Sequence, residues 1–316
     1  MFNLIFALVA FGASSTFAGE LEDLTQRELA SPHLVTTREL KSIQATQFIF
    51  VDGIFGDFYH GNFKPAEQVL REDYQTEGTT LVPQSVVPIQ DNSEIIFSRV
   101  RDLREASGKS QAILMGHSKG AGELMYMLLR HPEVVRNMGI SAIGIISAPL
   151  AGTRVVGFID TMCANEGPHS LCHFLNVLFP SLESFRPEFI QPLYSEALER
   201  LSSSDRALIG SKIFYVRTQM PKDDFNSPLY LPNLWMRTSH PEDGPNDGAI
   251  PTKNQIMYEN GFNPNDPVFG TDLGIMMIDH NGLMNRARTP ASLRYRESFF
   301  KILTRKLLFA QDHLLD

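Results

Sequence analysis

Residues 111–122 read QAILMGHSKGAG, and this stretch decides the fold. The short apolar segment 111–115 runs directly into the motif GHSKG at 116–120, and the helical stretch 123–130 follows. Gly-x-Ser-x-Gly alone is a modest signal, but between a buried strand and a helix it is typical of a sharp turn that presents the serine oxygen above a sheet. The start of the helix also gives that oxygen a positive electrostatic environment. We therefore predict Ser118 as a nucleophile; the alternative is an ordinary surface turn.

The segments on both sides of this motif alternate between two patterns. Short β-rich apolar runs favour buried strands, and stretches with apolar residues near helical spacing separate them. The predicted strands are 47–51, 79–88, 111–115, 140–147 and 212–217; the predicted helices are 66–73, 92–106, 123–130 and 290–308, after a polar surface lead-in over 20–45. This alternation predicts an α/β fold with a mostly parallel sheet flanked by helices on both faces.

Composition restricts the class of protein. The chain has 316 residues, of which 43% are hydrophobic and 20% are charged, enough for one large core. The net charge is −8 and there is no basic stripe or run of Lys and Arg, which argues against nucleic acid as a partner. No Cys/His spacing matches a zinc site, and we expect neither a metal nor an organic cofactor. The sequence carries no signal for an oligomeric state.

The first eighteen residues are nearly all apolar or small. Residues 2–11 form an apolar run that is short for a membrane span, and residues 16–18 (TFA) are similar to a small-x-small cleavage site. We predict a signal peptide over 1–18 and one domain over 19–316, and hence an exported protein that is periplasmic or secreted. No Lys or Arg precedes the apolar run, so the alternative is a buried N-terminal strand or helix.

The segment 152–210 interrupts the alternation of strands and helices. Its roughly sixty residues are more than a crossover between neighbouring strands needs, and long insertions often cover active sites. We predict an inserted cap, or lid, here; the alternative is one ordinary crossover helix with long loops. Its apolar residues are Phe158, Phe174, Leu175, Val177, Leu178 and Phe179. In an oxidising compartment Cys163 and Cys172 are expected to form a disulfide; otherwise they are free thiols.

A serine nucleophile needs a base, and in this kind of site the base follows the acid along the chain. We predict His280 as the base. It lies in MIDHNGL at 277–283, after the last predicted strand and before the C-terminal helix. The carboxyl-terminal edge of a strand is where a loop would place a base beside the serine. His240 is the alternative, whereas the remaining downstream histidines lie in the predicted cap or within predicted helices.

The orienting acid is predicted at Asp247, in NDGAIP at 246–251. A carboxylate in a turn made by Asn, Asp and Gly is held rigidly by local backbone hydrogen bonds. This turn also follows the strand 212–217 in the required chain order. The alternative is an ordinary Asp-Gly turn, with Asp243 and Asp272 as competing acids.

The carbonyl that a serine attacks needs two donors for its developing negative charge. One is expected to be the backbone N–H of Lys119, the residue after the serine. The second is expected from the segment DGIFG at 52–56, whose glycines let the backbone approach a ligand closely. We choose the N–H of Ile54 as this donor and expect Phe55 and His117 to contact the substrate. The alternative for this segment is a plain strand-ending turn.

Several segments together resemble the bacterial lipase and esterase group of α/β-hydrolases. In chain order these are 51–56, similar to an oxyanion loop; 116–120, the serine turn; 147–153, similar to a lipase loop after the next strand; 246–251, similar to an acid loop; and 279–283, similar to a histidine loop. The resemblance covers about residues 47–285. It implies an α/β-hydrolase fold and ester hydrolysis that proceeds through an acyl-enzyme intermediate.

The same resemblance implies a Ser118–His280–Asp247 triad with Ile54 and Lys119 as oxyanion donors. The sequence departs from the family at Asp52, which stands where the family usually has His. A carboxylate near the oxyanion would oppose its charge, which puts ordinary lipase activity in question.

We expect the protein to hydrolyse carboxylic esters with a lipid-like or other apolar acyl group, since a pocket for an acyl chain must be apolar. Small-molecule or lipid esters are therefore the expected partners, with transient contact to a membrane or lipid surface. One alternative is acyl transfer to an alcohol, which uses the same triad. Another is a non-catalytic binding protein that keeps the fold without the chemistry.

Overall fold

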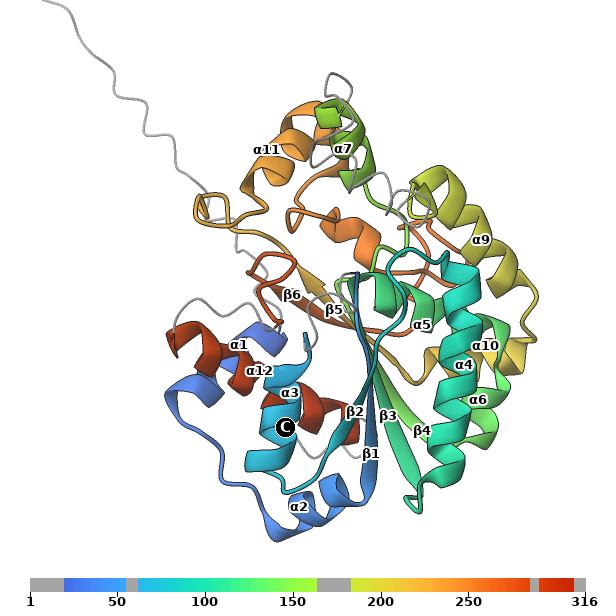
Figure 1. Ribbon diagram of the computed structural model, residues 1–316, viewed down its shortest axis with the longest axis vertical. Coiled ribbons are helices and arrows are strands. Elements are labelled where there is room, and N and C mark those ends of the chain that lie inside the picture. Colours follow the sequence, from blue (N-terminus) through green and yellow to red (C-terminus); the bar gives the residue numbers. More distant parts are fainter. Residues whose placement is uncertain (1–19, 55–61, 164–182, 285–289, 310–316) are drawn as a thin grey trace, which may run out of the picture.

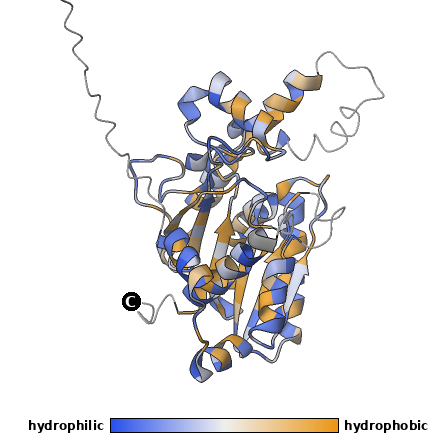
Figure 2. Ribbon diagram, turned by 90° about the vertical axis from the view of Figure 1, so that its left-hand side faces the viewer, coloured by the Kyte–Doolittle hydropathy of each residue, from blue (hydrophilic) through white to orange (hydrophobic). Residues whose placement is uncertain are grey.

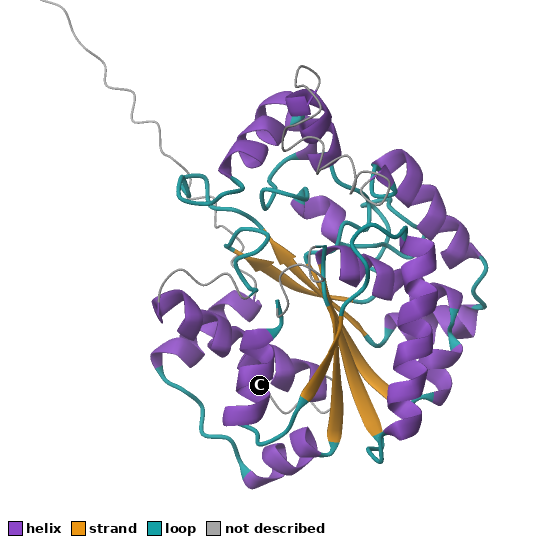
Figure 3. Cartoon of the chain, in the orientation of Figure 1, coloured by secondary structure: helices purple, strands orange, loops and turns teal. Residues whose placement is uncertain are grey.

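A central, all-parallel sheet organises the computed structural model, which describes residues 20–54, 62–163, 183–284 and 290–309 (Figure 1). Its strands lie in the order β2-β1-β3-β4-β5-β6. They are β1 (Thr46–Val51), β2 (Gly78–Leu81), β3 (Gln111–His117), β4 (Ile140–Ile146), β5 (Ile213–Thr218) and β6 (Thr271–Met276). Helices cover both faces of the sheet, as Figure 3 shows. The predicted α/β class with a mostly parallel sheet is confirmed.

The two faces are built from alternate residues of each strand. In β1, Ile49 and Val51 belong to one buried cluster, whereas Phe48 and Phe50 belong to the other. Side chains alternate between the faces of a strand, so an apolar run this continuous requires helices on both sides. The first face is covered by α4 (Ile89–Ala106), α5 (Ser118–Arg130), α6 (Glu133–Asn137), α9 (Pro187–Glu199) and α10 (Ser203–Gly210), and the second by α1 (Glu20–Ala30), α2 (Thr37–Gln44), α3 (Lys64–Glu72) and α12 (Pro290–Phe309).

The lead-in over 20–45 is largely exposed, as predicted, but its helix α1 packs against the second face of the sheet. Leu21 of α1 is buried in the second face, and Glu28 forms a buried ion pair with Arg305 of α12 at 2.6 Å. The polar sequence of α1 did not indicate that this helix packs against the sheet, because its ion-pair partners lie in α12, far away in the sequence. Within the described ranges, no helix combines the length and apolar character needed to cross a membrane.

The edge strands differ most from the sequence prediction. The predicted strand 79–88 is limited to β2, because Pro83 cannot donate to a ladder and ends the pairing. The strand β6 was not predicted; its sequence TDLGIM contains a glycine and is only partly buried. Both strands pair along one side only, where burial imposes a weaker apolar pattern.

Two helices project beyond the carboxyl-terminal edge of the sheet (Figures 1 and 2), and we refer to this pair as the cap. They are α7 (Val155–Cys163) and α11 (Tyr230–Ser239). The rings of Phe158 and Trp235 join them, with centroids 5.7 Å apart. The cap therefore combines part of the predicted insertion with a second segment, between β5 and β6, that the sequence did not single out.

The prediction that all of 152–210 forms a cap is wrong for α9. Ile190 and Tyr194 are fully buried against the first face of the sheet, and the Tyr194 hydroxyl donates to the carbonyl of Gly122 at 2.7 Å. The helix α9 is thus a crossover helix between β4 and β5, the alternative considered above. Its apolar residues serve the core, and composition alone did not distinguish core from cap.

Parts of the predicted insertion lie outside the described residues. Cys163 ends α7, but Cys172 belongs to the segment 164–182, as do Phe174 and Phe179. The disulfide between the two cysteines and the motion of the cap stay predictions.

Two neighbouring residues of α9 test its structural role. Ile190→Ala removes a fully buried side chain and is expected to lower the free energy of unfolding by about 2–5 kcal/mol. Phe189→Ala is the matched control, because Phe189 is 58% exposed, and should stay within about 0.5 kcal/mol. Urea denaturation of both variants measures the difference. Equal, small losses of unfolding free energy in both variants would contradict the packing of α9 against the sheet.

Candidate active site

The strand order places one crevice of the sheet beside the serine motif. From β1 the chain moves outward to β2, whereas β3 to β6 proceed toward the other edge. In open parallel sheets, ligands bind at the carboxyl ends of the strands where the order reverses. That position lies between the ends of β1 and β3, which are followed by Asp52 and Ser118.

Ser118 occupies a strained turn that close packing requires. Its φ is +54°, in the left-handed region that costs a non-glycine residue about 1–2 kcal/mol. A Cβ on Gly116 would lie 2.6 Å from the Cα of Ala121, and one on Gly120 would lie 2.0 Å from the carbonyl oxygen of Asp52. The helix α5 therefore begins directly against the end of β1, which only glycine permits at 120.

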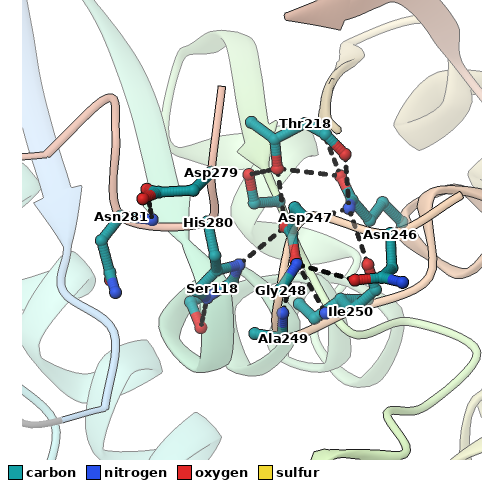
Figure 4. Close-up of polar contacts among 12 residues, drawn as sticks. Ser118, Thr218, Asn246, Asp247, Gly248, Ala249, Ile250, Asp279, His280 and Asn281 are labelled. Atoms are coloured by element: carbon teal, nitrogen blue, oxygen red, sulfur yellow. Dashed lines mark hydrogen bonds and ion pairs between the residues drawn. The ribbon is translucent and has the colours of Figure 1, made fainter. Parts of the chain in front are cut away.

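The three residues predicted as a triad lie in one hydrogen-bonded row (Figure 4). The Nε2 atom of His280 is 2.7 Å from the Oγ atom of Ser118, and its Nδ1 atom is 2.8 Å from Oδ2 of Asp247. All three side chains are buried; Ser118 retains 7% exposure. Their distances are those of a nucleophile, a base and an orienting acid.

Asp247 is held as an ion by its surroundings. Its Oδ1 atom accepts the backbone N–H groups of Ala249 and Ile250, at 2.9 and 2.7 Å. Burial alone raises the pKa of a carboxyl. Here the charge and hydrogen bond of His280, with donors from Thr218 and Ile250, outweigh burial and lower the pKa of Asp247 below its ordinary 3.8. The local turn predicted from NDGAIP therefore does hold the carboxylate.

Two further residues support the acid and were missed in the sequence. Thr218 donates its hydroxyl to Oδ2 of Asp247 at 2.7 Å, so the Ser147 hydroxyl must donate in turn to Thr218, at 2.6 Å. Gln255 accepts the Thr218 N–H and donates to Oδ2 of Asp247 at 3.1 Å. Thr218 directly follows a predicted strand, a position that signals a site residue; Gln255 has no such signal.

His117 and Lys119 flank the serine but point to different partners. Nε2 of His117 donates to the carbonyl of His280 at 2.9 Å, which fixes the backbone of the base. The Lys119 ammonium forms a buried ion pair with Glu123. Burial raises the pKa of Glu123 to about 7, with Lys119 and Asn92 opposing the shift. The Lys119 side chain is therefore structural, and only its backbone N–H is left for the substrate.

A cavity of about 240 Å³ opens beside Ser118 and is mostly apolar. The expected oxyanion residues Ile54 and Lys119 line it, as does His117. Phe55, the other expected substrate contact, lies outside the described residues. The apolar wall of the cavity comes from the cap and from the loops around the serine: Pro149, Val155, Ile159, Phe185, Leu229 and Ile250.

The alternative site residues lie in other ion pairs. His240 pairs with Glu242 at 3.2 Å, and Asp272 pairs with Arg217. His240, Glu242 and Asp243 present possible metal-ligand atoms within 4.8 Å of one another. However, Arg154 and Lys253 each contact Asp243 at 3.1 Å and already balance its charge. We therefore assign no metal to this group.

Solved structures match this chain in fold, whereas no protein-family model and no curated protein matches its sequence. A metagenomic carboxyl esterase superposes with a TM-score of 0.58 at 16% identity, over 86% of this chain and 76% of that one. Phospholipase PlaB from Legionella pneumophila matches with a TM-score of 0.47 at 14% identity, over 66% of this chain and 45% of that one. The likeness to the esterase shows an α/β-hydrolase-like fold, as the sequence predicted.

The contact between α5 and β1 can be tested with one methyl group. In Gly120→Ala the new Cβ meets backbone atoms that cannot move away, so we expect a loss of about 3 kcal/mol or more in unfolding free energy. Gly108→Ala is the control, because nothing lies within 4 Å of its Cβ, and it should change stability by less than about 1 kcal/mol. Urea denaturation measures both. A tolerated alanine at 120 would contradict this packing.

The lowered pKa of Asp247 predicts a pH dependence of stability. A carboxyl whose pKa is lower in the folded state stabilises the protein above its ordinary pKa, and this contribution is lost as the pH falls through the folded pKa. Below about pH 5, the difference in unfolding free energy between wild type and Asp247→Asn should shift in favour of the variant as the pH falls. Urea unfolding across this range measures it; a constant difference down to about pH 3 contradicts the assignment.

Proposed function

We propose that this protein is a serine hydrolase that cleaves carboxylic esters through an acyl-enzyme on Ser118. The observation that carries the proposal is the row Ser118–His280–Asp247 at the wall of an apolar cavity. A buried serine, a histidine and an ionised carboxylate in this order match the roles of nucleophile, base and orienting acid. The esterase-like fold agrees with this chemistry without specifying it.

In the proposed reaction, Nε2 of His280 takes the proton of Ser118 as Oγ attacks the ester carbonyl. Asp247 stays ionised and stabilises the imidazolium that forms, consistent with its lowered pKa. The backbone N–H groups of Ile54 and Lys119 bind the developing oxyanion. His280 then gives its proton to the leaving alcohol, and water releases the acyl group by the same steps in reverse.

The surroundings of the cavity support a substrate with an apolar acyl group. Val155 and Ile159 of α7, with Leu229 before α11, line the cavity beside the serine. The cap and the loop before α11 also expose large apolar side chains: Met162, Phe225, Leu231 and Leu234. We propose that these contact a lipid surface transiently while an ester enters. Export by the predicted signal peptide, to the periplasm or the medium, would bring the protein to such substrates.

Labelling and turnover together test this function. A fluorophosphonate probe should label wild type once, at Ser118, and Ser118→Ala should take no label and lose about 10⁶-fold in kcat on p-nitrophenyl esters. His280→Ala should be nearly as inactive, because triad members act as one unit, whereas His240→Ala should resemble wild type. Labelling of Ser118 without hydrolysis in water, but with ester formation in added alcohol, would instead identify an acyltransferase. A folded wild type that takes no label sinks the proposal.

A further inference from the structure

Asp52 is a buried carboxylate beside the serine that the reaction above does not use. It directly follows β1, at the position where the similar lipases carry His, and it is 1% exposed. Its Oδ1 atom accepts the backbone N–H of Gly53 at 2.9 Å and the side-chain amide of Asn62. The backbone N–H of Asn62 also donates to this carboxylate. A buried carboxyl group that accepts this many hydrogen bonds is held in a single orientation.

These donors come from the two ends of one segment. Gly53 begins the segment that carries the proposed oxyanion donor Ile54, and Asn62 follows that segment and lines the same cavity. The carboxylate of Asp52 therefore joins both ends. Its own backbone is fixed from the opposite side, where Gly120 of α5 packs against its carbonyl oxygen.

Gly53, at the start of this segment, packs directly against Ser118. A Cβ on Gly53 would lie 3.1 Å from the Cβ of Ser118 and 3.1 Å from the carbonyl oxygen of His117. A small rotation of the peptide between Gly53 and Ile54 would therefore change where the Ile54 N–H points relative to Ser118. An oxyanion donor is useful only when its direction is set before the reaction begins.

We propose that Asp52 is the positioning residue of the oxyanion hole: its carboxylate oxygen accepts from Gly53 and Asn62 and so directs the Ile54 N–H toward the reacting carbonyl. This inference rests on the proposed ester hydrolysis. The role requires an accepting oxygen, whereas a full negative charge would oppose the oxyanion. Burial, with Glu67 of α3 as a further contribution, raises the pKa of Asp52, and the hydrogen bonds from Asn62 and Gly53 lower it.

Two substitutions separate the accepting oxygen from the charge. Asp52→Ala removes the acceptor, and kcat per fluorophosphonate-labelled site should fall about 10²–10³-fold, the loss typical of one oxyanion donor. KM should change little, because the donor acts on the transition state. Asp52→Asn keeps an oxygen of the same shape and should retain kcat within about tenfold. The control is Asp272→Ala, because the carboxylate of Asp272 pairs with Arg217 and does not line the cavity. This variant should leave kcat unchanged.

A boronic acid supplies a readout that a folding defect does not mimic, because it forms a tetrahedral adduct on the serine and uses the oxyanion hole. Its inhibition constant should rise in Asp52→Ala by a factor similar to the loss in kcat, and should stay near the wild-type value in Asp52→Asn. Unchanged kcat per labelled site in Asp52→Ala, or equal damage in both variants, would overturn the role of Asp52. A wild type that takes no label and hydrolyses no ester would overturn the underlying function instead.

Discussion

The contact between Gly120 and the carbonyl oxygen of Asp52 is the constraint on which the site depends. It brings the first turn of α5 against the end of β1, and so joins the two loops that flank the crevice of the sheet. Next to this contact, Ser118 begins the helix with its backbone in the left-handed region. The packing of α5 against the first face of the sheet offsets the energetic cost of that backbone strain. The same packing thereby positions Ser118 and the backbone of Asp52 and Gly53.

The remaining parts of the site are held by hydrogen bonds between strand ends. Ser147 after β4 and Thr218 at the end of β5 connect to Asp247, so the acid takes its position from the sheet itself. Asn233 of the cap helix α11 also donates to Asn246, next to the acid, at 2.7 Å. The cap is therefore attached to the acid loop as well as to the cavity wall.

Sequence patterns predicted best what depends on neighbouring residues. The strands β1, β3, β4 and β5 were located almost to the residue because each is buried on both faces and reads as a continuous apolar run. The serine motif and the turn around Asp247 are equally local, and the structure brings both to His280 as expected. The contributions of Thr218, Gln255 and Asn62 depend on topology, since their partners are distant in sequence or across a loop. The same limit explains α1 and α9, whose polar or apolar composition did not reveal which surface they cover.

The pairing of α1 with α12 also has a consequence for how the chain reaches its native state. Phe48 and Phe50 of β1 point toward the second face of the sheet, which is covered jointly by α1 and α12. Contacts this distant in sequence form late and slow the approach to the native state. Until α12 has been made, that face is covered only in part, by α1, α2 and α3. A chain that has been made only as far as β6 therefore keeps part of this apolar face open, and a chaperone bound there would protect it from aggregation.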